Sequence, residues 1–303
     1  MLASFYLCSR SIEYNGTDSD SDIIKKLYSL YDLIAQIHKT PNNEFLLNKK
    51  SFCDTVIFPS GKKVSDIISY DKSIKRDIRN LFLFMFSYAS KDTEASFEDM
   101  IEYLSLEDEN NCNALLVLNI IKELENKIEQ IISNIRDWRS FMRKKMIKYN
   151  KDEKTFVTNS QYYFPNLCFS CTTTFYNDLS KILDTHRASL IKALSLLNDE
   201  FISIYKDEKD FVRALQKFGC YKEIDGCSFE GKKDDKLNID FINEKGISFV
   251  TKYCEAHIKI NTPDKYKKLS GDYHDYCRIY FAKPEEECDT VYVGAICHHH
   301  NTK

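Results

Sequence analysis

Glycine is distributed very unevenly along this chain of 303 residues. None lies between Lys62 and Phe218, whereas six of the eight fall from Gly219 onward. Glycine permits the positive-φ conformations of tight turns, so a long stretch without it favours helices, and a glycine-containing stretch favours strands and turns. We therefore expect an α+β protein, with a mostly α-helical domain at residues 1–218 and a small antiparallel β-sheet module with flanking helices at residues 219–303.

Helical patterns support the first part of this division. Apolar residues recur at helical spacing over residues 23–37. Ser96-Phe-Glu-Asp99 resembles a capping box. Residues 113–149 contain neither proline nor glycine and keep one apolar stripe, which predicts a single helix of more than thirty residues. A short helix is expected to end before Gly219, which would supply a left-handed C-cap.

Strand patterns dominate the last part of the chain. Two runs, residues 237–242 and 247–260, are joined by a loop that contains Gly246, and they predict a hairpin. Polar and apolar residues alternate at the end of the second run and again over residues 276–281 and 291–296. These patterns predict two further strands after the hairpin, the last of which is followed by three histidines.

Strand parity predicts a shared face for several polar groups. Successive side chains of a strand point to opposite faces, so Glu255, His257 and Lys259 lie on one face. The same rule places Arg278 and Tyr280 on one face of the next strand. If the strands pair as a meander, one side of the sheet displays a carboxylate, an imidazole, an amine, a guanidinium and a phenol.

These groups match the needs of RNA cleavage through the 2′-hydroxyl, which requires a base, an acid and positive charge near the phosphate. Glu255 or His257 is a candidate base. His257, His298 or His299 is a candidate acid, because histidine titrates near neutral pH.

Two basic residues would hold the phosphate, and an aromatic residue would stack on a base. Lys259 and Arg278 are the candidates for the first role, and Tyr280 for the second. A purely structural interpretation also fits. The wet face of an antiparallel sheet normally carries alternating charges, and Glu255 would then pair with Arg278 or Lys259.

The order Glu-x-His-x-Lys, then Tyr-x-Arg-Ile-Tyr-Phe, then a strand ending in histidine resembles the C-terminal sheet of the RelE/ParE-like toxin superfamily. The resemblance covers residues 205–303. It implies a small antiparallel sheet with flanking helices and an endoribonuclease-like activity that needs no metal. It further implies that RNA or the ribosome is a partner, that an antitoxin protein is another, and that the role lies in toxicity or phage defence. The implied RNA contacts are Lys259, Arg278 and Tyr280, with proton transfer by His257 or His299.

The same tail resembles an uncharacterised set of bacterial proteins with a Glu-Pro-His-x-Lys strand, an Arg-Ile-Tyr-Phe strand and a strand of the form Ile-Gly-x-Ile-Gly-x-His. Ala256 stands here in the proline position, and Cys297 in that of the second glycine. Gly294 and His299 fit the pattern. This resemblance implies that the positions matter and names no reaction.

Composition narrows the classes of function. The net charge is −3, so any nucleic-acid site must depend on a local patch. No apolar run is long enough to span a membrane and the first residues do not resemble a signal peptide, so we expect no membrane partner and a cytoplasmic protein. An odd count of eleven cysteines then indicates reduced thiols. The Cys168-Phe-Ser-Cys171 pair lacks partners at a familiar zinc spacing, so we expect no metal and no cofactor.

A second class of function stays open at this point. The polar face would then be a non-catalytic module that binds a nucleotide, a nucleic acid or a protein. The helical region would be a sensor, an inhibitory partner or a platform for oligomerisation in either case.

Overall fold

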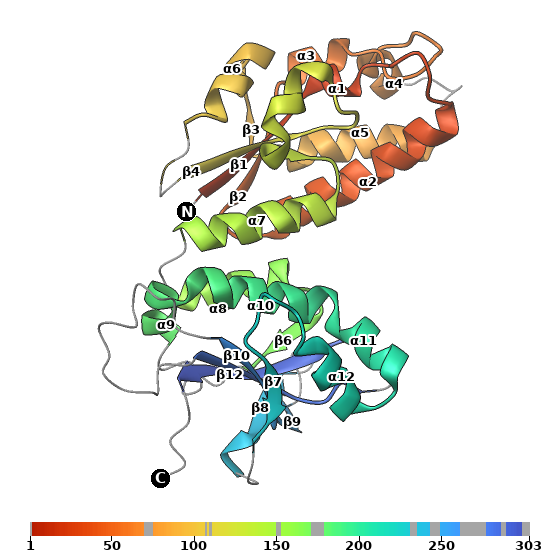
Figure 1. Ribbon diagram of the computed structural model, residues 1–303. Coiled ribbons are helices and arrows are strands. Elements are labelled where there is room, and N and C mark those ends of the chain that lie inside the picture. Colours follow the sequence, from red (N-terminus) through yellow and green to blue (C-terminus); the bar gives the residue numbers. More distant parts are fainter. Residues whose placement is uncertain are drawn as a thin grey trace. The chain divides into compact units, whose positions relative to one another are not determined.

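The computed structural model describes residues 2–69, 75–106, 108, 111–149, 153–170, 179–230, 235–242, 249–260, 277–285 and 289–298. The chain forms two compact units, Met1–Lys145 (unit 1) and Met146–Lys303 (unit 2). Each unit contains helices and a β-sheet, as Figure 1 shows, and the expected α+β class is confirmed. The expected boundary at residue 218 lies inside unit 2, because helices and a strand that precede it belong with the C-terminal strands.

A five-stranded sheet lies at the centre of unit 1, where the sequence predicted a mostly helical domain. Its strand order is β3-β2-β1-β4-β5, and every neighbouring pair is parallel. The strands are β1 (Leu2–Leu7), β2 (Asn43–Leu47), β3 (Lys91–Asp92), β4 (Asn111–Leu116) and β5 (Ile131–Ile132). Parallel strands need crossover connections, which the helices of this unit provide.

Several helices of unit 1 begin at a side-chain cap. The helices of this unit are α1 (Ser9–Ile12), α2 (Asp20–Lys39), α3 (Lys49–Asp54), α4 (Val64–Ile68), α5 (Arg76–Tyr88), α6 (Phe97–Tyr103), the 3₁₀ segment η1 (Lys122–Gln130) and α7 (Ile135–Tyr149), which continues past the unit boundary. Those with a side-chain cap are α2, α3 and α6. The Ser19 side chain accepts a hydrogen bond from the Asp22 N–H at the start of α2. Ser96 and Asp99 form the expected capping box of α6, so that prediction is confirmed.

The single long helix predicted at residues 113–149 is wrong. The segment contains β4, η1, β5 and α7 instead. Residues 114–118 are all buried. The first three end the central strand β4, and the last two directly follow it. A central parallel strand is buried on both faces, so its sequence is a continuous apolar run that periodicity alone does not distinguish from a buried helix.

Unit 2 contains a second five-stranded sheet with the order β6-β12-β11-β10-β7. Its strands are β6 (Leu167–Phe169), β7 (Cys227–Phe229), β10 (Ala256–Ile260), β11 (Cys277–Phe281) and β12 (Val291–His298). All neighbours are antiparallel except β6 and β12, which are parallel. The meander of β10, β11 and β12 confirms the strands expected near the C-terminus.

The hairpin expected near residue 246 is present as β8 (Asn238–Ile242) and β9 (Phe249–Tyr253), which pair antiparallel. One detail differs from the expectation. The run over residues 247–260 is not one strand, because Cys254 and Glu255 separate β9 from β10. After this break β10 pairs with β11 and β7.

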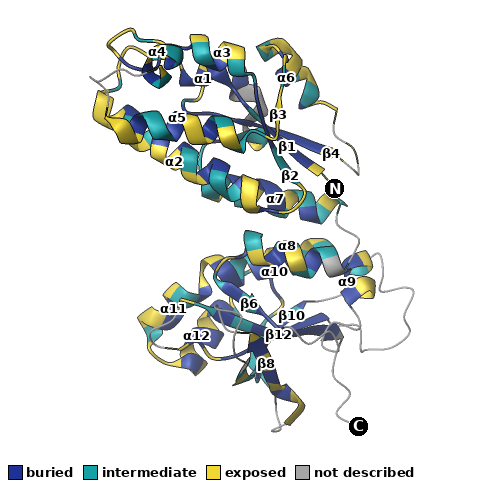
Figure 2. Ribbon diagram, turned by 180° about the vertical axis from the view of Figure 1, so that it is seen from behind, coloured by how far each residue is buried: buried dark blue, intermediate teal, exposed yellow. Residues whose placement is uncertain are grey.

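The two faces of the unit 2 sheet are both covered. The remaining elements are α8 (Glu153–Tyr163), α9 (Leu179–Thr185), α10 (Arg187–Asp199), α11 (Phe201–Glu208), α12 (Phe211–Phe218) and η3 (Asp235–Leu237). On one face Phe281 packs edge-on against Phe201, with ring centroids 5.2 Å apart. On the other face the hairpin places Ile239 and Cys254 in one cluster with Tyr280. The meander strands are therefore largely buried, as the dark blue of Figure 2 shows.

Gly219 does not adopt the expected left-handed conformation at the end of α12. Its φ is −63°, which is helical. A Cβ at this position would lie 3.1 Å from the Cys227 N atom and 3.2 Å from the Leu215 O atom. The small size of glycine, and not its positive-φ freedom, is therefore what the fold uses here.

No helix in the described part of the chain has the length and apolar character needed to cross a membrane.

Candidate functional site

Strand register brings four of the expected site residues together on one face of the unit 2 sheet. His257 lies opposite Tyr280, and Lys259 lies opposite Arg278. Residues that face each other across an antiparallel pair have neighbouring side chains on the same face. The shared face that parity predicted for these four residues is therefore present.

This face is buried, whereas the alternating pattern predicted a face displayed to solvent. The relative exposure of His257 is 2%, that of Tyr280 is 0% and that of Arg278 is 9%. The cause is the hairpin of β8 and β9, whose apolar side chains pack against Tyr280 and its neighbours in β12. Lys259 alone among the four is partly exposed.

Glu230, which directly follows β7, is the carboxylate that binds these groups. Arg278 Nη1 and the Tyr280 hydroxyl both donate to Glu230 Oε1, each at 2.7 Å. Arg278 Nη1 also donates to the Tyr280 hydroxyl oxygen at 3.2 Å. The Glu230 side chain is 18% exposed and that of Arg278 is 11% exposed, so this ion pair is largely withdrawn from water.

Tyr280 acts as a hydrogen-bond donor to the carboxylate. Burial raises the pKa of Tyr280 well above its ordinary value, and its hydrogen bond to Glu230 acts in the same direction. The phenol therefore keeps its proton at all physiological pH values. The Glu230 carboxylate thus has one cationic donor and one neutral donor on the same oxygen.

His257 lies between this carboxylate and a hydroxyl. Its Nδ1 is 3.5 Å from Glu230 Oε1, and its Nε2 is 3.1 Å from the Ser228 Oγ. Its ring packs against that of Tyr280, with centroids 5.3 Å apart. An imidazole that carries its proton on Nδ1, toward the carboxylate, presents Nε2 as an acceptor to the hydroxyl.

The order carboxylate, imidazole and hydroxyl is the arrangement that activates a hydroxyl as a nucleophile. The contact between Nδ1 and the carboxylate is longer than a good hydrogen bond. Ser228 and His257 are direct cross-strand partners, and Glu230 follows Ser228 by two residues. The edge of the sheet therefore holds three chemically matched groups on adjacent strands.

Two of the expected site residues lie elsewhere. Glu255 precedes β10, and its carbonyl oxygen accepts a hydrogen bond from the Glu230 N–H at 2.9 Å. The pairing of Glu255 with Arg278 that the structural interpretation proposed is replaced by the pairing of Glu230 with Arg278. His299 lies outside the described residues, and so does the side chain of His298.

Sequence reasoning missed Ser228 and Glu230. The signal that would have found them is the alternation in Cys227-Ser-Phe-Glu230, which gives the two polar residues the same parity. The run is only four residues long, and nothing in the sequence shows that it pairs with β10. Its importance depends on a partner strand almost thirty residues away.

The cysteines do not form a metal site among the described residues, where no group of three or more histidine, cysteine, aspartate or glutamate side chains is placed to hold an ion. Cys168 lies in β6, and Cys171 lies outside the described residues. Burial raises the pKa of the Cys227 thiol to about 12, so the thiol is protonated at neutral pH.

Comparison of the chain with protein-family models, curated proteins and solved structures finds no match. The geometry of the site and the chemistry of its residues are therefore the basis for assigning it a function.

Proposed function

We propose that unit 2 is an endoribonuclease module in which His257 transfers protons. The observation that carries this proposal is the position of the His257 ring, with one nitrogen toward the Glu230 carboxylate and the other toward the Ser228 hydroxyl. A histidine held in this way can remove the proton of a hydroxyl group that lies next to its Nε2 atom. The resemblance to RelE/ParE-like toxins supports RNA as the source of that hydroxyl.

The reaction follows from this placement. His257 Nε2 removes the proton of a ribose 2′-hydroxyl that takes the place of the Ser228 hydroxyl. The 2′-oxygen then bonds to phosphorus and the bond from phosphorus to the 5′-oxygen breaks. The leaving 5′-oxygen takes up a proton from water, and the imidazolium of His257 returns its proton to water. The products are a 2′,3′-cyclic phosphate and a free 5′-hydroxyl. Glu230 stabilises the imidazolium that forms, and Lys259, which is partly exposed, supplies positive charge for the phosphate.

Arg278 and Tyr280 have a positioning role in this proposal. Both are buried and both bind Glu230, so they fix the carboxylate that orients His257. Their polar atoms are engaged with Glu230, so this proposal gives neither residue the direct contact with RNA that the resemblance implied. Access is at β7, which is an edge strand of the described sheet and carries the partly exposed Ser228.

The Ser228 hydroxyl favours a second candidate function. If Ser228 itself attacks the substrate, the centre is a serine hydrolase that acts through a covalent intermediate on an ester or related bond. The distance of 3.1 Å between Ser228 Oγ and His257 Nε2 supports this alternative. The two candidates differ in what they require of Ser228 and of the substrate.

The test uses the full chain with single-stranded RNA, with and without ribosomes, and with the same oligonucleotide carrying 2′-deoxyriboses. We expect cleavage of RNA only, cyclic phosphate ends, and a rate about 100-fold or more lower for His257→Ala. The matched control is His38→Ala, because His38 is an exposed histidine in unit 1. Parent-level cleavage by the His257 variant contradicts the proposal.

Ser228→Ala separates the two candidates. The endoribonuclease proposal expects this variant to keep cleaving RNA, whereas a serine hydrolase loses its activity and its labelling by a fluorophosphonate. If the parent chain neither cleaves RNA nor takes up the label, both catalytic candidates fail and a non-catalytic binding module is the remaining function. In bacterial cells the endoribonuclease proposal expects the parent chain to arrest growth and His257→Ala to permit it.

A further inference from the structure

Helices α2 and α5 of unit 1 lie side by side and present a patch of apolar and aromatic side chains to solvent (Figures 1 and 2). The residues of this α2/α5 patch are exposed or half-buried, and they are Tyr28, Tyr31, Ala35, His38, Leu83, Phe84 and Tyr88. Tyr28 and Leu83 are each 43% exposed, and Phe84 is 46% exposed. Eight large apolar side chains are exposed in the described part of the chain, and three of them lie here, so they form a patch and are not scattered singly.

The rings of the patch hold one another in place. Tyr88 stacks on His38, with ring centroids 4.8 Å apart, and on Phe84, with centroids 6.3 Å apart. Tyr31 packs against Phe84 at 5.9 Å and against Tyr88 at 6.1 Å. A surface whose side chains are already ordered loses little conformational freedom when a partner covers it. The patch is therefore suited to forming an interface.

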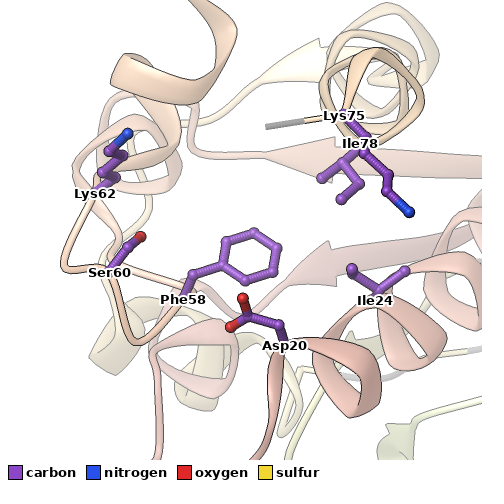
Figure 3. A pocket seen from close by; sticks show the side chains of 7 residues that line it. All are labelled: Asp20, Ile24, Phe58, Ser60, Lys62, Lys75 and Ile78. Atoms are coloured by element: carbon purple, nitrogen blue, oxygen red, sulfur yellow. The ribbon is translucent and has the colours of Figure 1, made fainter. Parts of the chain in front are cut away.

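Apolar side chains continue along the groove between the two helices toward their first turns. Ile24 lies one turn of α2 before Tyr28, and it lines a pocket together with Ile78 of α5 and Phe58 (Figure 3). The apolar groove therefore extends over most of the length of both helices.

The composition of the α2/α5 patch narrows the class of partner. The patch contains no lysine, arginine, aspartate or glutamate. Nucleic acids and anionic membranes are bound largely through lysine and arginine, so the patch favours neither. Aromatic side chains with few charges are instead typical of the core of a protein–protein interface.

The charges at the two ends of α2 favour a second copy of this chain as the partner. The first turn of α2 contains Asp20 and Asp22. Its last turn contains His38 and Lys39. When a two-fold axis passes near Tyr31, the α2 helices of two copies run antiparallel and the first turn of each lies beside the last turn of the other. Acidic groups then face basic groups, and the two helix dipoles are also antiparallel.

The area of the face fits a reversible dimer. Helix α2 has 20 residues and α5 has 13. At the usual rise per residue they are about 30 Å and about 20 Å long, and each is about 10 Å wide. The face is therefore about 500 Å² per copy, so a dimer buries about 1,000 Å² in total. This is the lower limit for a specific interface, so the two copies are expected to dissociate on dilution.

We infer that the α2/α5 patch is the interface of a reversible, two-fold symmetric homodimer in which the two α2 helices are antiparallel. Tyr31 lies near the axis, and each copy covers Leu83 and Phe84 of the other. The patch belongs to unit 1, so this inference does not depend on the endoribonuclease proposal for unit 2.

The test is sedimentation velocity of the full chain in reducing buffer, at chain concentrations from about 1 µM to about 100 µM. We expect twice the mass of one chain at the high end of the series and one chain at the low end. Leu83→Glu places a charge in the patch and is expected to weaken the dimer at least tenfold. The matched control is Val212→Glu in α12 of unit 2, where Val212 is 49% exposed, and it is expected to dimerise like the parent. Both positions are exposed, so both variants should keep the melting temperature of the parent.

Charge reversal tests the antiparallel arrangement. Asp20→Lys places two lysines side by side at each end of the interface, and Lys39→Glu does the same with two acidic groups. We expect each variant alone to dimerise more weakly than the parent, and an equimolar mixture of the two to recover the affinity of the parent.

Three results overturn the inference. The first is a parent chain that stays monomeric over the whole concentration series, which leaves the patch to a partner of another kind. The second is equal affinity of the Leu83→Glu and Val212→Glu variants. The third is a mixture of Asp20→Lys and Lys39→Glu that associates no more tightly than either variant alone.

Discussion

Gly294 of β12 is the position where one added methyl group should disturb unit 2 most. The pairing of β11 with β12 shifts register here, because Tyr280 pairs with Ala295 whereas Phe281 pairs with Val293. Gly294 is the extra residue of this bulge. A Cβ at Gly294 would lie 2.5 Å from Ile239 Cδ1 and 2.6 Å from Cys254 Sγ.

The expected cost of Gly294→Ala follows from these distances. Carbon atoms pack at about 3.5–4.0 Å, so the added methyl group would overlap two neighbours by about 1 Å each. Both neighbours are buried, since Ile239 is 1% exposed and Cys254 is 0% exposed, so neither has room to move aside. Overpacking of this kind costs about 1–3 kcal/mol, and we expect the upper end of that range. For a unit of this size, ~3 kcal/mol lowers the melting temperature by about 6–12 °C.

The assay combines thermal unfolding with hydrogen exchange measured by mass spectrometry. We expect faster exchange in peptides from β8, β9 and β12 and unchanged exchange in peptides from unit 1, which serve as the internal control. Ile239→Val removes the Cδ1 atom and Cys254→Ala removes the Sγ atom, so adding both should restore part of the stability lost in Gly294→Ala. A Gly294→Ala variant that melts with the parent, or that these two changes do not rescue, would refute the packing of the hairpin on β12.

Four further predictions concern single groups. Arg278→Met should destabilise unit 2 by about 3 kcal/mol in denaturant unfolding, because it leaves the Glu230 carboxylate without its cation. Adding Glu230→Gln should recover part of this loss of stability. An unchanged unfolding midpoint in Arg278→Met contradicts the buried ion pair. Iodoacetamide should modify the exposed Cys220 much faster than Cys227, whose pKa is raised to about 12 by burial. The Cys227 thiol holds its proton more tightly in the folded chain than in the unfolded chain. The stability that Cys227 contributes is therefore complete below pH 9 and falls between pH 9 and about 12. Unfolding measured against pH in the parent and in Cys227→Ala checks this prediction. Ser96→Ala should cost about 1 kcal/mol and speed exchange at the start of α6, and no change there would argue against the capping box.

The sequence by itself determined the features that depend on short segments. The capping box at residues 96–99 and helix α2 were predictable because their signals lie within one or a few turns of helix. The shared face of His257 and Lys259 was predictable because side chains alternate along any strand, whatever its partner.

Only the tertiary structure decided which strands pair and what covers each face. Residues 114–118 are apolar in a way that suits a helix or a central strand, and their place beside β1 settles the choice. Likewise Glu230, and not Glu255, is the partner of Arg278, because β7 returns to pair with β10 across almost thirty residues. The hairpin then buries the face that alternation alone would leave in water. The physical reason is that local hydrogen bonds and side-chain alternation are properties of a few consecutive residues. Strand pairing and the covering of a face are instead decided by contacts between segments far apart in the chain, which a local pattern does not contain.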